Sequence, residues 1–179
     1  MNYASAGEHV PEAECNNRTI KDQVQTTYHQ LPYACIPKVL IRHLVLRATR
    51  MLNLLPAKGG ISAYLSPHTI ITHRVVDYDC EFAISFGAYI QANQDNTPTN
   101  TNLPQTLDCI FLGPTTGKQP GCNLLNLATR QVIVCPKVQE LLITNLIIDA
   151  VHQLAIKDGS NPWMGGVLGF RRRWVRESL

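Results

Sequence analysis

The sequence lacks several features that mark well-known classes of protein. It has no uninterrupted apolar run of 18 residues, so it predicts no membrane-spanning helix. Its start, MNYASAGEHVPEAECNN, has neither the basic region nor the apolar core of a secretory signal, which argues against export. Charged residues make up 16% and hydrophobic residues 45%, a balance that excludes wholesale disorder and allows a sizeable core.

The cysteines lack any pairing pattern. The six occur singly, at positions 15, 35, 80, 109, 122 and 135, with no CxxC and no Cys pair matched by a His pair. Zinc sites need such spacings, so none is predicted. Without a secretion signal we expect reduced thiols and an intracellular protein, nuclear or cytoplasmic.

Acidic residues are missing from the whole stretch between Asp22 and Asp77, which carries six Lys and Arg and a formal charge of +6. The last nine residues, RRRWVRESL, add a local +3. Such blocks favour a polyanionic partner, most simply nucleic acid. A basic surface that binds nothing remains the alternative on charge alone.

The apolar spacing predicts an α+β protein. Helices are expected at 13–30, at 36–55 (with proline at both ends) and at 137–157, where Gly159 would end the last one. Strands are expected at 82–92, 108–112, 123–127 and 131–134, with a polar loop before the second. We therefore expect a helical, basic part at 1–76, a β-rich part with a closing helix at 80–159, and a basic tail at 160–179.

No isolated motif predicts an enzyme. GPTTGKQPG has three residues, not four, between Gly113 and Gly117, and Gln follows Lys118, so a turn is favoured over a phosphate-binding loop. His152 is expected to be a packed or solvated helical residue. The carboxylates of Asp77 and Asp79 are expected in a cap or turn rather than on a metal.

Four segments, taken in order, resemble the integrase region of copia-type retrotransposons. PEAECNNRTIKDQV is similar to the family's last catalytic segment, and LPYACIPKVLIRHLVLRATRMLNLLPAKGGISAYLSPHTIIT to the helix that follows. DYDCEFAISFGAYIQA resembles the stretch leading into the small SH3-like domain. CIFLGPTTGKQPGCNLLNLATRQVI resembles its strands, with their Leu-Gly-Pro turn and a Thr-Gly hairpin. The resemblance covers about residues 7–159.

The resemblance implies a helical remnant of an RNase H-like integrase core, followed by a small SH3-like β-barrel and a closing helix. In the intact family two Asp and one Glu hold paired Mg²⁺ ions. Here Glu14 matches the Glu, as a vestigial catalytic and metal-ligating residue, but no Asp precedes it. Arg130 stands at the hairpin glycine, where a positive φ would strain it. We therefore expect no cofactor and no strand transfer.

The expected activity is nonspecific binding of DNA or RNA. The candidate contacts are Arg18, Lys21, Lys38, Arg42, Arg47, Arg50, Arg171, Arg172, Arg173 and Arg176. An alternative is a protein-interaction module whose apolar helix at 36–55 docks on an intact integrase or on a second copy of the chain. A translated pseudogene without function is the third reading.

Overall fold

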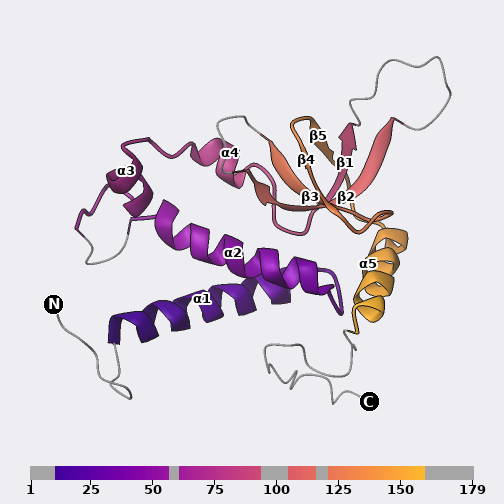
Figure 1. The fold of residues 1–179 in the computed structure, drawn as a ribbon, viewed down its shortest axis with the longest axis horizontal. Coiled ribbons are helices and arrows are strands. Elements are labelled where there is room, and N and C mark those ends of the chain that lie inside the picture. Colours follow the sequence, from indigo (N-terminus) through magenta and orange to yellow (C-terminus); the bar gives the residue numbers. More distant parts are fainter. Residues whose placement is uncertain (1–10, 57–60, 94–104, 116–120, 160–179) are drawn as a thin grey trace, which may run out of the picture. The chain divides into compact units, whose positions relative to one another are not determined.

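The structure, a computed structural model, describes residues 11–56, 61–93, 105–115 and 121–159. These residues form helices and one antiparallel sheet, so the predicted α+β class is confirmed (Figure 1). Two compact units share the chain. Residues up to Leu31 and His43–Ala83 form unit 1, whereas Pro32–Arg42 and the chain from Ile84 onward form unit 2. The sequence places a boundary near residues 76–80 but does not anticipate that the 32–42 segment belongs with the sheet.

Unit 1 is helical, as the apolar spacing predicts. It contains α1 (Pro11–Gln30), the larger part of α2 (Lys38–Leu54), α3 (Pro67–Thr72) and α4 (Tyr78–Phe82). The bounds of α1 and α2 fall within two residues of those expected at 13–30 and 36–55. The bounds could be predicted closely because prolines mark the ends of these helices. Pro11 is the first residue of α1, and Pro37 and Pro56 flank α2.

Unit 2 is built on a five-stranded antiparallel sheet in the order β4-β3-β2-β1-β5. The strands are β1 (Tyr89–Asn93), β2 (Thr106–Pro114), β3 (Cys122–Asn126), β4 (Val132–Cys135) and β5 (Val138–Glu140), followed by α5 (Asn145–Lys157). One apolar cluster within the sheet includes Ile90, Cys109, Phe111 and Leu124. In β2, residues 109–112 are buried on both faces, which explains the continuous apolar run CIFL.

The connection between β4 and β5 requires the sheet to curl. In a flat sheet these two edge strands would lie four strand spacings apart, about 19 Å. Only Pro136 and Lys137 separate Cys135 from Val138, and three consecutive Cα–Cα steps span at most about 11 Å. The edges must therefore approach each other. Consistently, the Cys135 thiol donates to the carbonyl of Asn93 at the end of β1, with an Sγ–O distance of 3.2 Å.

A bulge in β2 adds to this curvature. The register between β2 and β3 shifts between Phe111 and Gly113. Gly113 has a φ of 138°, which residues with a side chain rarely adopt. An extra residue on one strand bends that strand and increases its twist. The Leu-Gly-Pro sequence is therefore needed inside the strand rather than in a turn.

Two predicted elements are wrong in part. The strand expected at 82–92 is only β1, because Phe82 ends α4 and a turn at Phe86–Gly87 intervenes. The helix expected at 137–157 starts at Asn145, because Val138–Glu140 form β5 against β1. The apolar residues of 138–142 fit helical spacing, but the open edge of β1 offers that backbone a ladder of hydrogen bonds instead. Gly159, with a φ of 75°, follows the end of α5 as expected.

Within the described residues, none of the helices is long and apolar enough to cross a membrane.

Candidate nucleic-acid interface

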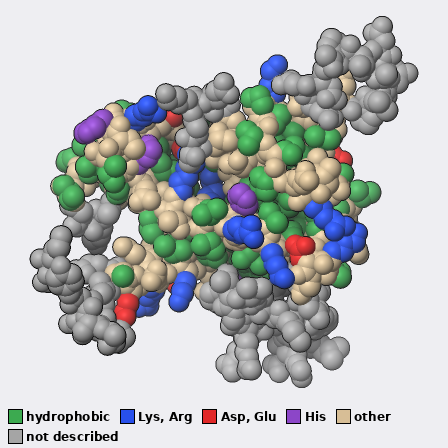
Figure 2. Space-filling model, viewed as in Figure 1, with side chains coloured by type: hydrophobic (Ala, Val, Ile, Leu, Met, Phe, Trp, Pro, Cys, Tyr) green, Lys and Arg blue, Asp and Glu red, His purple; other side chains and the backbone are tan. Residues whose placement is uncertain are grey.

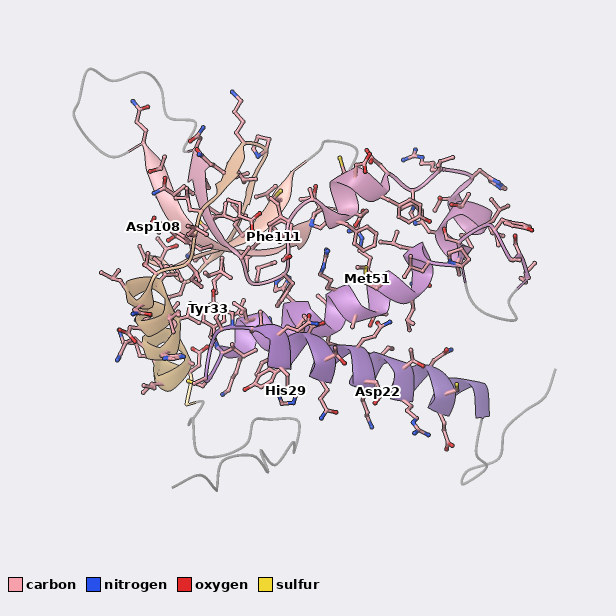
Figure 3. All side chains as sticks on the ribbon, turned by 180° about the vertical axis from the view of Figure 1, so that it is seen from behind. Asp22, His29, Tyr33, Met51, Asp108 and Phe111 are labelled. Carbon is pink, nitrogen blue, oxygen red and sulfur yellow. The ribbon has the colours of Figure 1, made fainter. Side chains whose placement is uncertain are left out.

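The exposed face of α1 carries the first group of candidate residues. Glu14, Arg18 and Lys21 are spaced i, i+4 and i+7, so they share one side of the helix, and all three are exposed. Figure 3 labels Asp22 and His29, which are also exposed, on the side of α1 turned away from α2. Val24, one turn after Lys21, is buried. This face is therefore solvated and of mixed charge, with two cations available to a partner.

Glu14 lies near the start of α1 and is exposed. The described part of the chain contains no group of three or more His, Cys, Asp or Glu side chains placed to hold a metal ion. A pair of Mg²⁺ ions needs several carboxylate oxygens around it. The role of Glu14 as a vestigial metal ligand therefore stays a prediction.

The second group lies at the start of α2, in unit 2. Lys38 and Arg42 are one turn apart and both are exposed. The backbone N–H of Lys38 donates to Asp158 Oδ2 at 3.2 Å, so a carboxylate from the end of α5 caps the first turn of α2. This contact links the start of α2 to the end of α5 within unit 2.

Arg47 and Arg50 lie on another side of α2 and contact α4. Arg50 Nη2 forms an ion pair with Glu81 Oε1, and Arg47 Nη2 donates to the backbone carbonyl of Glu81 at 3.0 Å. Burial lowers the pKa of the Arg47 guanidinium, an effect that Glu81 opposes and Arg50 reinforces. These two predicted phosphate contacts are thus engaged within unit 1, and Glu81 is the residue that sequence reasoning missed. The acidic run DYDCE directly after the acid-free stretch is the signal that could have identified it.

The four arginines Arg171, Arg172, Arg173 and Arg176 lie outside the described residues, as does Lys118 of the GPTTGKQPG segment. Their contribution to the interface stays a prediction.

Two other candidate residues have the structural roles expected for them. The side chain of Asp77 caps α4, with its Oδ1 accepting from the backbone of Cys80 at 3.1 Å. Hydrogen bonds from the Cys80 backbone hold the pKa of the Asp77 carboxyl below its usual value. His152 of α5 accepts a hydrogen bond from the N–H of Ala34 at 2.9 Å through Nε2, so it is a packed residue of unit 2.

Exposed apolar side chains gather farther along the chain than the predicted docking helix. In α2, Leu40, Leu44, Ala48 and Leu54 are buried, and Leu46 is exposed. Around α3, in contrast, large apolar side chains face solvent, and Figure 2 shows them interspersed with His and cations. They are Ile61, Tyr64, Leu65, Ile71 and Val75.

The chain has no match among the family models, the curated proteins or the solved structures searched.

Proposed function

We propose that this chain is the C-terminal part of a copia-type integrase region and that it binds DNA or RNA without sequence preference. The observation that carries the binding proposal is the exposure of Arg18 and Lys21 on α1 and of Lys38 and Arg42 on α2. Lys38 and Arg42 lie within a stretch of more than fifty residues that contains no Asp or Glu, so no acidic side chain is close to them in sequence. Exposed cations on helices position a protein on phosphates without reading bases.

The finer fold within the proposal is an SH3-like domain after the end of an RNase H-like core. Its support is the strand order of unit 2, in which four strands form a meander and β5 pairs back onto β1. The curl that the short β4–β5 connection requires is what a small, partly closed barrel needs. Arg130, at the position of the family's hairpin glycine, has a φ of 62° and so keeps the backbone conformation that glycine would favour.

The proposal does not include strand transfer. The observations that support the proposal are exposed cations on helices, which bind phosphates. Binding is therefore the activity assigned to this chain.

A salt titration tests the binding proposal. We expect a fluorescein-labelled 20-base-pair duplex to bind at 50 mM salt and to lose affinity steeply by 200 mM, because each neutralised phosphate releases counterions. The double variant R18A/K21A should reduce the slope of log affinity against log salt by about 2, about 1 for each phosphate contact. An affinity that does not change with salt would contradict the proposal.

The matched control is K137A/K157A. Like R18A/K21A, this variant removes two positive charges, but it removes them from exposed positions outside α1 and α2. If both double variants weaken binding equally, net charge and not the α1 face determines affinity.

The exposed apolar residues around α3 favour a second candidate function, docking on a protein partner. If copies of the chain dock on each other, the mass measured by light scattering should rise with protein concentration. Substituting serine for Ile71, which is 77% exposed, should suppress that rise without loss of helical content. A strictly monomeric wild-type protein at every concentration counts against self-association.

A further inference from the structure

Helix α4 places an acidic segment against the basic flank of α2. With its capping residue it carries Asp77, Asp79 and Glu81, the first carboxylates after the acid-free stretch. None of the five residues of α4 is buried. Its two aromatic side chains, Tyr78 and Phe82, remain 42% and 44% exposed, so apolar packing holds α4 only in part.

Three polar contacts also attach α4 to α2. The Glu81 carboxylate pairs with Arg50, and the carbonyl of the same residue accepts from Arg47. Tyr78 adds a third contact, in which its hydroxyl donates to the carbonyl of Leu54 at 3.1 Å. All three contacts are of a kind that water, salt or a phosphate can replace.

The Glu81 carboxylate is an incomplete partner for these arginines. Its Oε1 accepts from Arg50, but its Oε2 is buried without a hydrogen-bond partner in the described part of the chain. A buried, unpaired carboxylate oxygen is unfavourable, so the contact is weaker than a fully satisfied pair. A phosphate group at the same position would offer oxygens to both guanidinium groups and stay in contact with water.

We propose that α4 is an autoinhibitory segment in which Glu81 occupies the place of a nucleic-acid phosphate on Arg47 and Arg50. This inference rests on the proposed nucleic-acid binding and adds its regulation. In the closed state the chain contacts nucleic acid through its exposed cations alone. When α4 detaches, Arg47 and Arg50 add two phosphate contacts on the same helix. Binding and detachment of α4 are then coupled, because nucleic acid and Glu81 compete for the same guanidinium groups.

The test compares E81Q with D79N. Both substitutions remove one negative charge from α4, but only E81Q weakens the contact with Arg50, since Asp79 is exposed on the same helix. With the labelled duplex at 50 mM salt, we expect E81Q to bind about five- to tenfold more tightly than wild type, with a salt slope steeper by 1 to 2. D79N should change affinity by less than about twofold. Adding R47A/R50A to E81Q should abolish the gain.

A second variant, Y78F, weakens the attachment of α4 without altering charge. Y78F should also increase the affinity for the duplex and steepen its salt dependence, but by less than E81Q does. If circular dichroism shows that E81Q is unfolded, Y78F decides whether α4 is autoinhibitory. Equal gains for E81Q and D79N overturn autoinhibition. Salt-dependent wild-type binding that neither E81Q nor Y78F improves also overturns it, and leaves the proposed function standing. Absence of binding by every protein at 50 mM salt overturns both.

Discussion

At the scale of single residues, Arg130 is the clearest departure from local preference. Its φ of 62° lies in the left-handed region, which costs a residue with a side chain about 1 kcal/mol or more. The hairpin imposes it. Asn126 Oδ1 accepts from the N–H groups of Ala128 and Thr129, and the Arg130 N–H donates to the Asn126 carbonyl at 2.8 Å. The hydrogen bonds of Asn126 therefore hold the β3–β4 turn in a shape that requires the left-handed conformation at Arg130.

Glycine at position 130 should stabilise the protein. R130G removes the left-handed strain, and the greater freedom of glycine in the unfolded chain offsets part of that gain, so we expect about 0.5 to 1 kcal/mol in the free energy of unfolding. The measurement is the urea midpoint followed by circular dichroism. T129G is the control and should lower the midpoint, because Thr129 is not among the residues of positive φ. A lower midpoint for R130G would show that the Arg130 side chain contributes more than its strain costs.

At the scale of elements, the segment between α1 and α2 behaves as part of the sheet unit. Tyr33, which is labelled in Figure 3, is buried, and its hydroxyl donates to the Gly87 carbonyl at 2.8 Å. The Ala34 N–H binds His152, and the Lys38 N–H binds Asp158. The chain from Tyr33 to Lys38 thus contacts the turn before β1 and the middle and C-terminal end of α5, which are far away in sequence.

Removing the Tyr33 hydroxyl should destabilise unit 2. Y33F leaves the aromatic ring in place but leaves the Gly87 carbonyl without this donor, which we expect to cost about 1 to 2 kcal/mol. Urea unfolding measures the change. Y64F is the matched control, since Tyr64 is 90% exposed, and it should alter the midpoint by less than the error. Equal effects of the two variants would mean that the Tyr33 contact contributes nothing to stability.

At the scale of the whole molecule, stability should fall at alkaline pH. Burial raises the pKa of the Cys109 thiol to about 12, from an ordinary value of 9.0. Burial likewise raises the pKa of Tyr33. Above about pH 9 the unfolded chain therefore releases protons that the folded chain retains, so the free energy of unfolding decreases as pH rises.

The alkaline loss should be reduced in C109A. We expect the urea midpoint of the wild type to drop between pH 8 and pH 10.5, and the drop to be smaller in C109A whatever its stability at pH 8. C15A is the control, because Cys15 is exposed and its removal should leave the drop unchanged. A drop of the same size in all three proteins would exclude Cys109 as its source.

The sequence by itself determined the elements whose signals are local. Apolar spacing and proline placed α1 and α2 to within two residues, and apolar runs with turn residues located β2, β3 and β4. Arg18, Lys21, Lys38 and Arg42 were named from the sequence as candidate contacts, and the structure places all four at exposed positions on helices. Each of these features depends on residues that are close together in the chain, so a single sequence is enough to predict it.

Only the tertiary structure decided the outcomes that depend on distant partners. Val138–Glu140 became β5 because the edge of β1 was open, although its own spacing was also compatible with a helix. Arg50 faces Glu81, 31 residues away, rather than solvent. The segment from Pro32 joined the sheet unit through contacts with Gly87 and His152. Hydrogen bonds and ion pairs of this kind form only once the chain has folded back on itself, and they outweigh local preferences of a few tenths of a kcal/mol per residue.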